Sequence, residues 1–265
     1  MKQILILISS LLLFSCSKAT HTGTTPIPPS STISVIDLSP TLESQILGGT
    51  QHYAVYLPPS YTKEPQRRYP VLYLLHGMYQ NYKSWFSDGG LQATADKAIA
   101  EGAVEMIIIC PNGFNSFYYN TADMHYEDFF IREFVPEVER RYRILSEKEH
   151  RNIAGLSMGG FGATYLAFQH HELFGNAYST SGGFIEPATT LLKDIINAKL
   201  ATEKSKFPTY TLECGEEDAL VIEYNRALSQ FLNEKQINYT KIFRQGTHNW
   251  KFWKESLPKI LRSVR

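Results

Sequence analysis

Cysteine is scarce in this sequence, with 3 residues in 265, and charge of neither sign is in excess. Lys plus Arg and Asp plus Glu number 26 each, so no strong overall field would recruit nucleic acid or acidic lipid. No basic run is interleaved with aromatic residues, as nucleic-acid-binding surfaces often require. We therefore expect no nucleic-acid partner.

Metal-ligand spacing is also missing. His170-His171-Glu172 is the only tight cluster of candidate ligands, and no fourth ligand lies near it in the sequence. Nor does any other pattern in the chain point to a cofactor. We expect neither a metal ion nor a cofactor.

The one long apolar run lies at the N-terminus, where Ile4 to Phe14 is almost wholly apolar. It is too short for a permanent membrane span but suits a secretory signal peptide. The following Leu13-Phe14-Ser15-Cys16 resembles a bacterial lipobox, which implies removal of residues 1–15 and lipidation of Cys16. The alternative is an ordinary signal peptide in which Cys16 is incidental. We expect an exported lipoprotein at the outer membrane or cell surface, with Cys16 as its only membrane contact.

After the anchor, residues 16–31 are rich in Ser, Thr and Pro, a composition typical of a flexible tether. Residues 32–265 are enough for one well-buried core and are expected to form a single catalytic domain.

Short apolar runs then alternate with helical patterns. Eight runs are predicted strands: Ile33–Leu38, Tyr53–Leu57, Val71–Leu75, Met106–Cys110, Asn152–Ala154, Asn176–Ser179, Tyr210–Glu213 and Tyr239–Phe243. The middle runs are continuously apolar, as in strands covered on both faces. Amphipathic stretches between them include Glu127–Tyr142, Gly159–Gln169 and Ile222–Lys235. This pattern predicts an α/β fold with an eight-stranded, mostly parallel, doubly wound sheet and helices on both faces. The one sizeable insertion, residues 181–208, would be a short cap.

Cys110 and Cys214 fall at the ends of strands several positions apart in this sheet. At about 4.8 Å per strand they would be roughly 19 Å apart, beyond the reach of a disulfide. We expect two buried thiols.

The fifth predicted strand runs into Gly155-Leu156-Ser157-Met158-Gly159-Gly160, and a helical pattern follows. A sharp strand-to-helix turn requires small residues around the serine and presents its hydroxyl at the helix N-terminus. A purely structural glycine-rich turn is the alternative. We favour Ser157 as a nucleophile of acyl transfer.

A serine nucleophile needs a base and an acid that orients the base. Of the eight histidines, only His248 follows the last predicted strand. In folds that present a serine nucleophile on such a strand-to-helix turn, the order along the chain is serine, acid, histidine. Between Ser157 and His248, the loop after the seventh strand offers both Glu217 and Asp218. Asp218 is preferred because it lies just before the next helix, but Glu217 stays open. The backbone N–H groups of Met78, after the third strand, and Met158 would form the oxyanion hole.

These motifs occur in the order found in the esterase D family of α/β-hydrolases, which the chain resembles from residue 33 to 265. The stretches that carry the resemblance are Val55–Tyr61, Tyr73–Gly77, Gly155–Gly160, Cys214–Asp218 and His248-Asn249-Trp250. The family includes feruloyl, acetyl xylan and tributyrin esterases, S-formylglutathione hydrolases and mycolyltransferases. The resemblance implies an α/β-hydrolase fold, Asp218 as the acid, and residues 116–127 lining or supporting the cleft.

Aromatic residues cluster in loops after the strands, at the end of the sheet where ligands bind in open α/β folds. The predicted substrate-binding residues are Trp85, Phe117, Tyr118, Tyr119 and Trp250; Phe114 and Phe184 lie in similar loops. We expect a serine carboxylesterase acting on an acylated carbohydrate or small ester, removing feruloyl or acetyl groups from polysaccharide. The alternatives are an esterase of short-chain lipids or siderophores, an acyltransferase, and a non-catalytic carbohydrate-binding relative.

Overall fold

The computed structural model describes residues 34–265. The predicted signal peptide, the tether and Cys16 therefore lie outside the described residues. Among residues 34–265, no helix combines the length and the apolarity that a membrane crossing would require.

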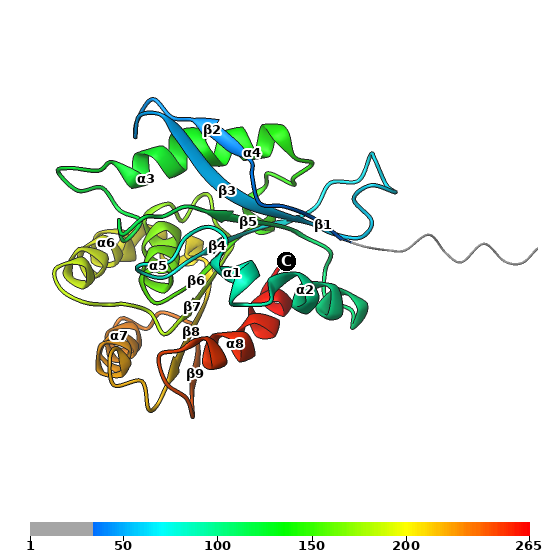
Figure 1. Cartoon of the computed structure of the whole chain (residues 1–265). Coiled ribbons are helices and arrows are strands. Elements are labelled where there is room, and N and C mark those ends of the chain that lie inside the picture. Colours follow the sequence, from blue (N-terminus) through cyan, green and yellow to red (C-terminus); the bar gives the residue numbers. More distant parts are fainter. Residues whose placement is uncertain (1–33) are drawn as a thin grey trace, which may run out of the picture. The chain divides into compact units, whose positions relative to one another are not determined.

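One sheet of nine strands organises the described residues (Figure 1). The strands are β1 (Val35–Asp37), β2 (Thr41–Glu43), β3 (Thr50–Leu57), β4 (Val71–Leu75), β5 (Ile107–Pro111), β6 (Arg151–Leu156), β7 (Asn176–Thr180), β8 (Thr209–Gly215) and β9 (Thr240–Arg244). Their order is β1-β3-β5-β4-β6-β7-β8-β9, and β2 pairs with β3. From β5 to β9 every neighbouring pair is parallel, whereas β1, β2 and β5 are antiparallel to β3. The predicted mostly parallel sheet is confirmed, and β2 is an additional strand.

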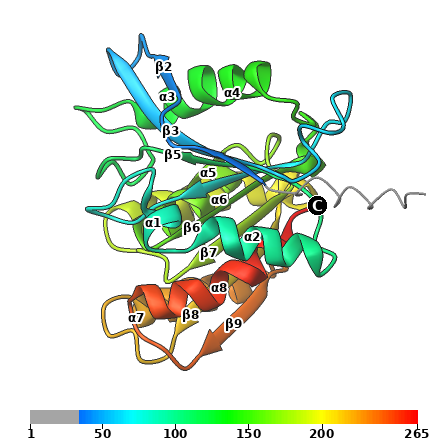
Figure 2. The same ribbon diagram turned by 45° about the vertical axis from the view of Figure 1, so that its right-hand side comes forward.

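Helices cover both faces of the sheet (Figure 2). They are α1 (Ser84–Ser87), α2 (Leu91–Ala100), α3 (Tyr126–Phe129), a π-helical turn (Phe130–Phe134), α4 (Val135–Arg141), α5 (Met158–Gln169), α6 (Ala188–Glu203), α7 (Ile222–Glu234) and α8 (Trp250–Ser263), with short 3₁₀ turns at Lys148–His150 and Lys204–Lys206. Alternate side chains of β4 divide between two cores: Tyr73 and Leu75 pack with residues of α3 to α7, and Leu72 and Leu74 with residues of α2 and α8. This two-sided burial explains the continuous apolar run.

The insertion expected as a short cap is mostly helix α6. Its Leu192 and Ile196 are fully buried and belong to the same core as Tyr73 and Leu75. Residues 181–208 thus form the helical crossover between the parallel strands β7 and β8. The helix therefore contributes to the core.

Cys110 lies in β5 and Cys214 in β8, with β4, β6 and β7 between those two strands. Both thiols are buried and neither forms a disulfide, as predicted. Burial raises the pKa of each thiol, Cys214 to about 12, so neither is a ready nucleophile at neutral pH.

Candidate active site

Ser157 lies in the sharp turn between β6 and α5. Its backbone has φ 53° and ψ −119°, outside the common regions for a residue with a side chain. A Cβ on Gly159 would lie 2.6 Å from the carbonyl oxygens of Leu75 and His76, so only glycine fits this close approach. The Ser157 N–H donates to Thr180 O at 3.0 Å, and the Gly183 N–H donates to Ser157 O at 2.8 Å. The neighbouring strand and its loop therefore hold the strained turn in place.

His248 connects this serine to a buried carboxylate. Its Nε2 is 2.9 Å from Ser157 Oγ, and its Nδ1 is 2.8 Å from Asp218 Oδ2. Asp218 is 0% exposed, and its other oxygen accepts from the Val221 N–H at 3.3 Å. The ends of β6, β8 and β9 thus bring the three predicted residues into one hydrogen-bonded chain.

Glu217 does not take part in this chain. Its side chain is exposed, while its N–H donates to Gly246 O at 3.1 Å in the loop before His248. The backbone of Glu217 thus ties the loop after β8 to the loop after β9. Of the two carboxylates left open by the sequence, Asp218 is the one in contact with His248.

The loop after β4 brings Met78 beside the nucleophile. A Cβ on Gly77 would lie 3.4 Å from the Ser157 Cβ. Among the interactions of residues 34–265, no protein acceptor takes the Met78 N–H. Met158 is the first residue of α5, where an N–H has no acceptor within the helix. The N–H groups of Met78, the residue after Gly77, and of Met158, the residue after Ser157, thus have no acceptor among the described backbone interactions.

His76 fixes the shape of the same loop. Its Nε2 accepts from the Gly113 N–H at 2.8 Å, so the proton lies on Nδ1, 2.7 Å from Gly77 O. Burial lowers the pKa of His76 to about 4, and its imidazole is neutral at pH 7. The Gly77 N–H also donates to the Gln80 side chain at 3.0 Å. These bonds hold the backbone on both sides of Gly77.

The prediction that Trp85 and Tyr118 bind substrate was wrong. Both side chains are 0% exposed and cannot stack on a substrate. Trp85 Nε1 donates to Leu75 O and Tyr118 OH donates to His76 O, each at 3.0 Å. These two hydrogen bonds support the backbone that leads into the loop of Met78. Phe184 is likewise fully buried.

The other three predicted aromatic residues are partly buried. Phe117 and Tyr119 pack edge-on against Phe161 of α5, four residues after the nucleophile. Trp250 packs edge-on between Trp85 and Trp253. Trp253 itself meets the His248 ring at 5.1 Å between centroids. Phe117 and Tyr119 thus support α5, and Trp250 supports the His248 loop. All three side chains keep some exposed surface.

The most exposed aromatic side chain near the Met78 loop belongs to Tyr79, which is 86% exposed. Its φ is 62°, and its N–H donates to Asn115 Oδ1 at 2.8 Å. Phe114, beside Asn115, is 39% exposed and has φ 51°. Phe114 lies in one of the aromatic loops expected from the sequence, whereas Tyr79 was not predicted, although its position next to Met78 was the available signal.

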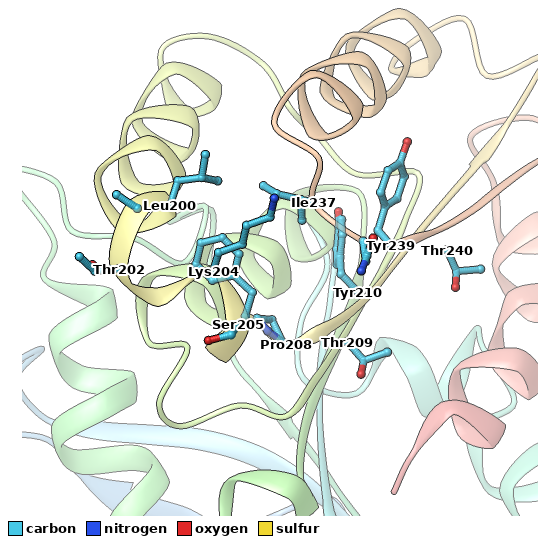
Figure 3. Close-up of a pocket in the computed structure, with 13 residues that line it drawn as sticks. Leu200, Thr202, Lys204, Ser205, Pro208, Thr209, Tyr210, Ile237, Tyr239 and Thr240 are labelled. Carbon is cyan, nitrogen blue, oxygen red and sulfur yellow. The ribbon is translucent and has the colours of Figure 1, made fainter.

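A cavity of about 860 Å³ opens elsewhere in the fold (Figure 3). It is lined by residues such as Thr209, Tyr210 and Thr240 at the starts of β8 and β9. Asp218 and His248 follow the opposite ends of these strands. A strand of seven residues spans about 20 Å, so this cavity is separate from the Ser157 site.

The pair His170 and His171, the tightest candidate ligand cluster of the sequence, binds carboxylates in the structure. His170 Nε2 is 2.7 Å from Glu127, and His171 Nε2 is 2.6 Å from Glu203. No group of three or more His, Cys, Asp or Glu side chains within residues 34–265 could hold a metal ion.

Comparison with known proteins places this geometry in a family. The model of the family named Esterase, described as "Putative esterase", matches residues 44–264. An endo-1,4-beta-xylanase/feruloyl esterase of Xylanibacter ruminicola is 34% identical over 157 residues, covering 56% of this chain and 22% of that protein. An acetyl esterase of Caldicellulosiruptor saccharolyticus is 26% identical over 215 residues, covering 69% of this chain and 78% of that protein. The chain thus matches about a fifth of the first relative and most of the second.

Solved structures agree with the sequence relatives. A ferulic acid esterase superposes with a TM-score of 0.79 at 29% identity, covering 87% of this chain and 99% of the other. The feruloyl esterase module of Clostridium thermocellum superposes with a TM-score of 0.70 at 21% identity, covering 89% of each chain. These neighbours confirm the α/β-hydrolase fold that the sequence predicted.

Proposed function

We propose that this chain, which belongs to the Esterase family, is a carboxylic ester hydrolase that works through a Ser157–His248–Asp218 triad. The observation that carries the proposal is the unbroken hydrogen-bonded chain, 2.9 Å from Ser157 Oγ to Nε2 and 2.8 Å from Nδ1 to Asp218. A serine hydroxyl becomes a useful nucleophile only when such a base takes its proton.

In the proposed reaction, Ser157 Oγ attacks the ester carbonyl while His248 Nε2 accepts the hydroxyl proton. Asp218 holds the proton on Nδ1 and stabilises the imidazolium. The N–H groups of Met78 and Met158 stabilise the oxyanion of the tetrahedral intermediate. His248 then protonates the leaving alkoxide, and water, activated by the same imidazole, releases the acid from Ser157. A sugar hydroxyl in place of this water would make the enzyme an acyltransferase.

For the acyl group we propose feruloyl or acetyl, carried by polysaccharide. The relatives named feruloyl esterase and acetyl esterase support this choice. The exposed rings of Tyr79 and Phe114 offer flat surfaces beside the loop of Met78. The proposed lipidation at Cys16 and export also suit a polymer too large to import.

The mechanism is tested by Ser157→Ala, which should lower kcat by about 10³-fold or more and leave the fold intact. Initial rates on nitrophenyl acetate, butyrate and octanoate, methyl ferulate and acetylated xylan would define the acyl group. A fluorophosphonate should label only Ser157 in the wild-type protein. Labelling at another residue, or near-normal activity of the variant, contradicts the triad. Rates that rise towards octanoate, without turnover of any sugar ester, would favour a lipid esterase.

The contribution of the exposed rings is tested separately with Tyr79→Ala and Phe114→Ala. Both side chains are exposed, so these variants should fold normally. Stacking is worth about 0.5–1.5 kcal/mol, so kcat/KM for methyl ferulate should fall roughly 2- to 13-fold while acetate hydrolysis stays unchanged. Tyr224→Ala is the control, because Tyr224 is also an exposed tyrosine but belongs to α7. Equal loss on ferulate and acetate would remove these rings from the substrate site.

A further inference from the structure

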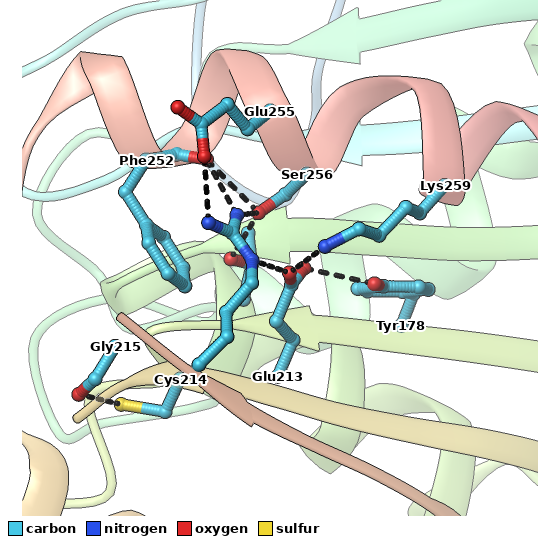
Figure 4. Close-up of polar contacts among 10 residues, drawn as sticks. Tyr178, Glu213, Cys214, Gly215, Phe252, Glu255, Ser256 and Lys259 are labelled. Carbon is cyan, nitrogen blue, oxygen red and sulfur yellow. Dashed lines mark hydrogen bonds and ion pairs between the residues drawn. The ribbon is translucent and has the colours of Figure 1, made fainter. Parts of the chain in front are cut away.

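An ion network surrounds the buried Glu213 near the ends of β8 and β9 (Figure 4). Glu213 is 0% exposed, and its Oε1 accepts from Arg244 Nε and Lys259 Nζ, each at 2.7 Å. Its Oε2 accepts from Tyr178 OH at 2.8 Å. Burial acts to raise the pKa of Glu213, but the bonds from Lys259 and Arg244 outweigh it and lower the pKa. A fully buried carboxylate thus stays ionised because two cations hold it.

Arg244 also reaches helix α8. Its Nη2 donates to Phe252 O at 3.0 Å and to Ser256 Oγ at 3.1 Å. The guanidinium carbon lies 3.7 Å from the centroid of the Phe252 ring. Arg244 is the last residue of β9, and α8 begins at Trp250. One side chain therefore joins the two ends of the loop 245–249, which carries His248.

Two further contacts connect this clamp with His248 and with the loop of Asp218. In the first turn of α8, Trp253 follows Phe252 and packs edge-on against the imidazole at 5.1 Å. On the other side, Arg244 O accepts from the Glu216 N–H at 2.8 Å, which links β9 to the loop that carries Asp218. The β9 end, the acid loop and the first turn of α8 are thereby fixed relative to one another.

We propose that Arg244, held by Glu213, is a positioning residue that keeps His248 in line between Ser157 and Asp218. This role rests on the proposed function of the triad. Arg244 touches none of the three side chains and acts through the loop 245–249 and Trp253. Displacing a reacting group by about 1 Å can cost about a hundredfold in rate. A clamp over a five-residue loop prevents displacement of this size.

The test compares Arg244→Lys with Arg244→Met and with Arg151→Met. Lysine keeps the charge that Glu213 needs, so this variant should fold, but one ammonium cannot bind the carboxylate and Phe252 O together. Arg151 is the matched control: it is 6% exposed, pairs with Glu139 at 2.7 Å, and lies at the start of β6, far from Ser157. Its loss should reduce stability and leave catalysis alone.

For Arg244→Lys we expect kcat to fall about a hundredfold with KM within about threefold, and a fluorophosphonate to label Ser157 correspondingly slowly. The low-field proton NMR signal of the His248 Nδ1–H should shift or broaden. Arg244→Met should show the same loss of kcat or a larger one. Arg151→Met should keep kcat within about threefold and leave that signal in place, whatever its melting temperature.

A kcat for Arg244→Lys within threefold of wild type would overturn the proposal, as would an equal loss of kcat in Arg151→Met. Failure of the triad itself is a different result: the wild-type protein would then show no labelling at Ser157.

Discussion

Burial decides which of two adjacent carboxylates meets His248. Glu217 and Asp218 share a loop and a charge, but Asp218 is fully buried and Glu217 is exposed. A buried carboxylate interacts with an imidazolium through a lower effective dielectric than an exposed one does. Its short side chain is also held by the Val221 N–H. Asp218 is therefore the better partner for a histidine that gains charge in the proposed reaction.

Asp218→Asn should lower kcat by about 10³- to 10⁴-fold, because the amide favours the wrong imidazole tautomer. Glu217→Gln is the matched control and should change kcat less than about threefold, since only the Glu217 backbone joins the His248 loop. Steady-state kinetics on nitrophenyl acetate would measure both. A larger effect at Glu217 than at Asp218 would reverse the assignment.

His76 predicts a pH dependence of stability. Its pKa is lowered from 6.5 to about 4 by burial. Between these values the unfolded chain binds a proton that the folded protein excludes, so the free energy of unfolding decreases as the pH falls. The full window corresponds to about 3 kcal/mol.

Urea unfolding of the wild-type protein and His76→Gln at pH 7 and pH 4 would isolate this effect. Other carboxylates contribute to both proteins and cancel in the difference, so the variant should lose less stability on acidification. Parallel decreases in the two proteins would show that His76 is not buried as a neutral imidazole.

The direction of a loop side chain was the hardest feature to predict from the sequence. Position after a strand indicated correctly that Ser157, Asp218 and His248 meet at one edge. Position alone could not indicate that the side chains of Trp85 and Tyr118 point inward. Their direction depends on hydrogen bonds to the carbonyl oxygens of Leu75 and His76. A ring with a polar tip satisfies such buried acceptors, and nothing in the local sequence distinguishes this role from stacking on a ligand.

Among the elements, the turn from β6 to α5 is the one with the least freedom. Gly159 faces the carbonyl oxygens of Leu75 and His76, the residues from which the Met78 loop departs. Any side chain here must push the nucleophile turn and that loop apart. The helix after the turn was predicted as amphipathic, but every residue from Met158 to Phe168 is buried. The turn itself was predictable from its glycines.

Gly159→Ala should destabilise the fold by about 1–3 kcal/mol through overpacking, and it should also slow fluorophosphonate labelling of Ser157. Gly90→Ala is the control: Gly90 has φ 67°, and a Cβ there would meet no atom within 4 Å, so alanine is strained without a clash. Both variants should lose stability, but only Gly159→Ala should lose labelling rate beyond its unfolded fraction. Normal labelling of folded Gly159→Ala would mean that the turn tolerates the shift.

Strand β2 and the ion pair of Glu213 and Arg244 could not be predicted from the sequence, for physical reasons. Strand β2 has three residues and pairs only with β3, so it carries no apolar run. Glu213 and Arg244 lie in strands, but their pairing depends on the register that places Arg244 opposite Gly215. The apolar strands of the sheet's centre were predictable because burial on both faces dictates their composition.

At the scale of the whole molecule, the order of strands explains how residues 91 positions apart become neighbours. Ser157, Asp218 and His248 follow β6, β8 and β9 at one edge, and the loop after β7 supplies the Gly183 N–H that holds the nucleophile turn. The cores on the two faces keep this edge rigid. The three residues of the proposed triad lie within residues 34–265, whereas the proposed anchor and tether lie in residues 16–31, so attachment to a membrane and catalysis should be separable.

Cys16→Ala tests that separation. We expect the full-length wild-type protein, expressed in a bacterium with lipoprotein processing, to partition with membranes and to incorporate a radioactive fatty acid. The variant should lose the label and be released, because several acyl chains on one residue provide the anchoring that a single weak contact cannot. Ser17→Ala keeps the thiol and should behave as wild type. Hydrolysis of a soluble ester should be equal in all three proteins, since Cys16 lies outside residues 34–265, which contain the triad. Membrane association that survives the loss of Cys16 would favour the ordinary signal peptide and assign the association to another surface.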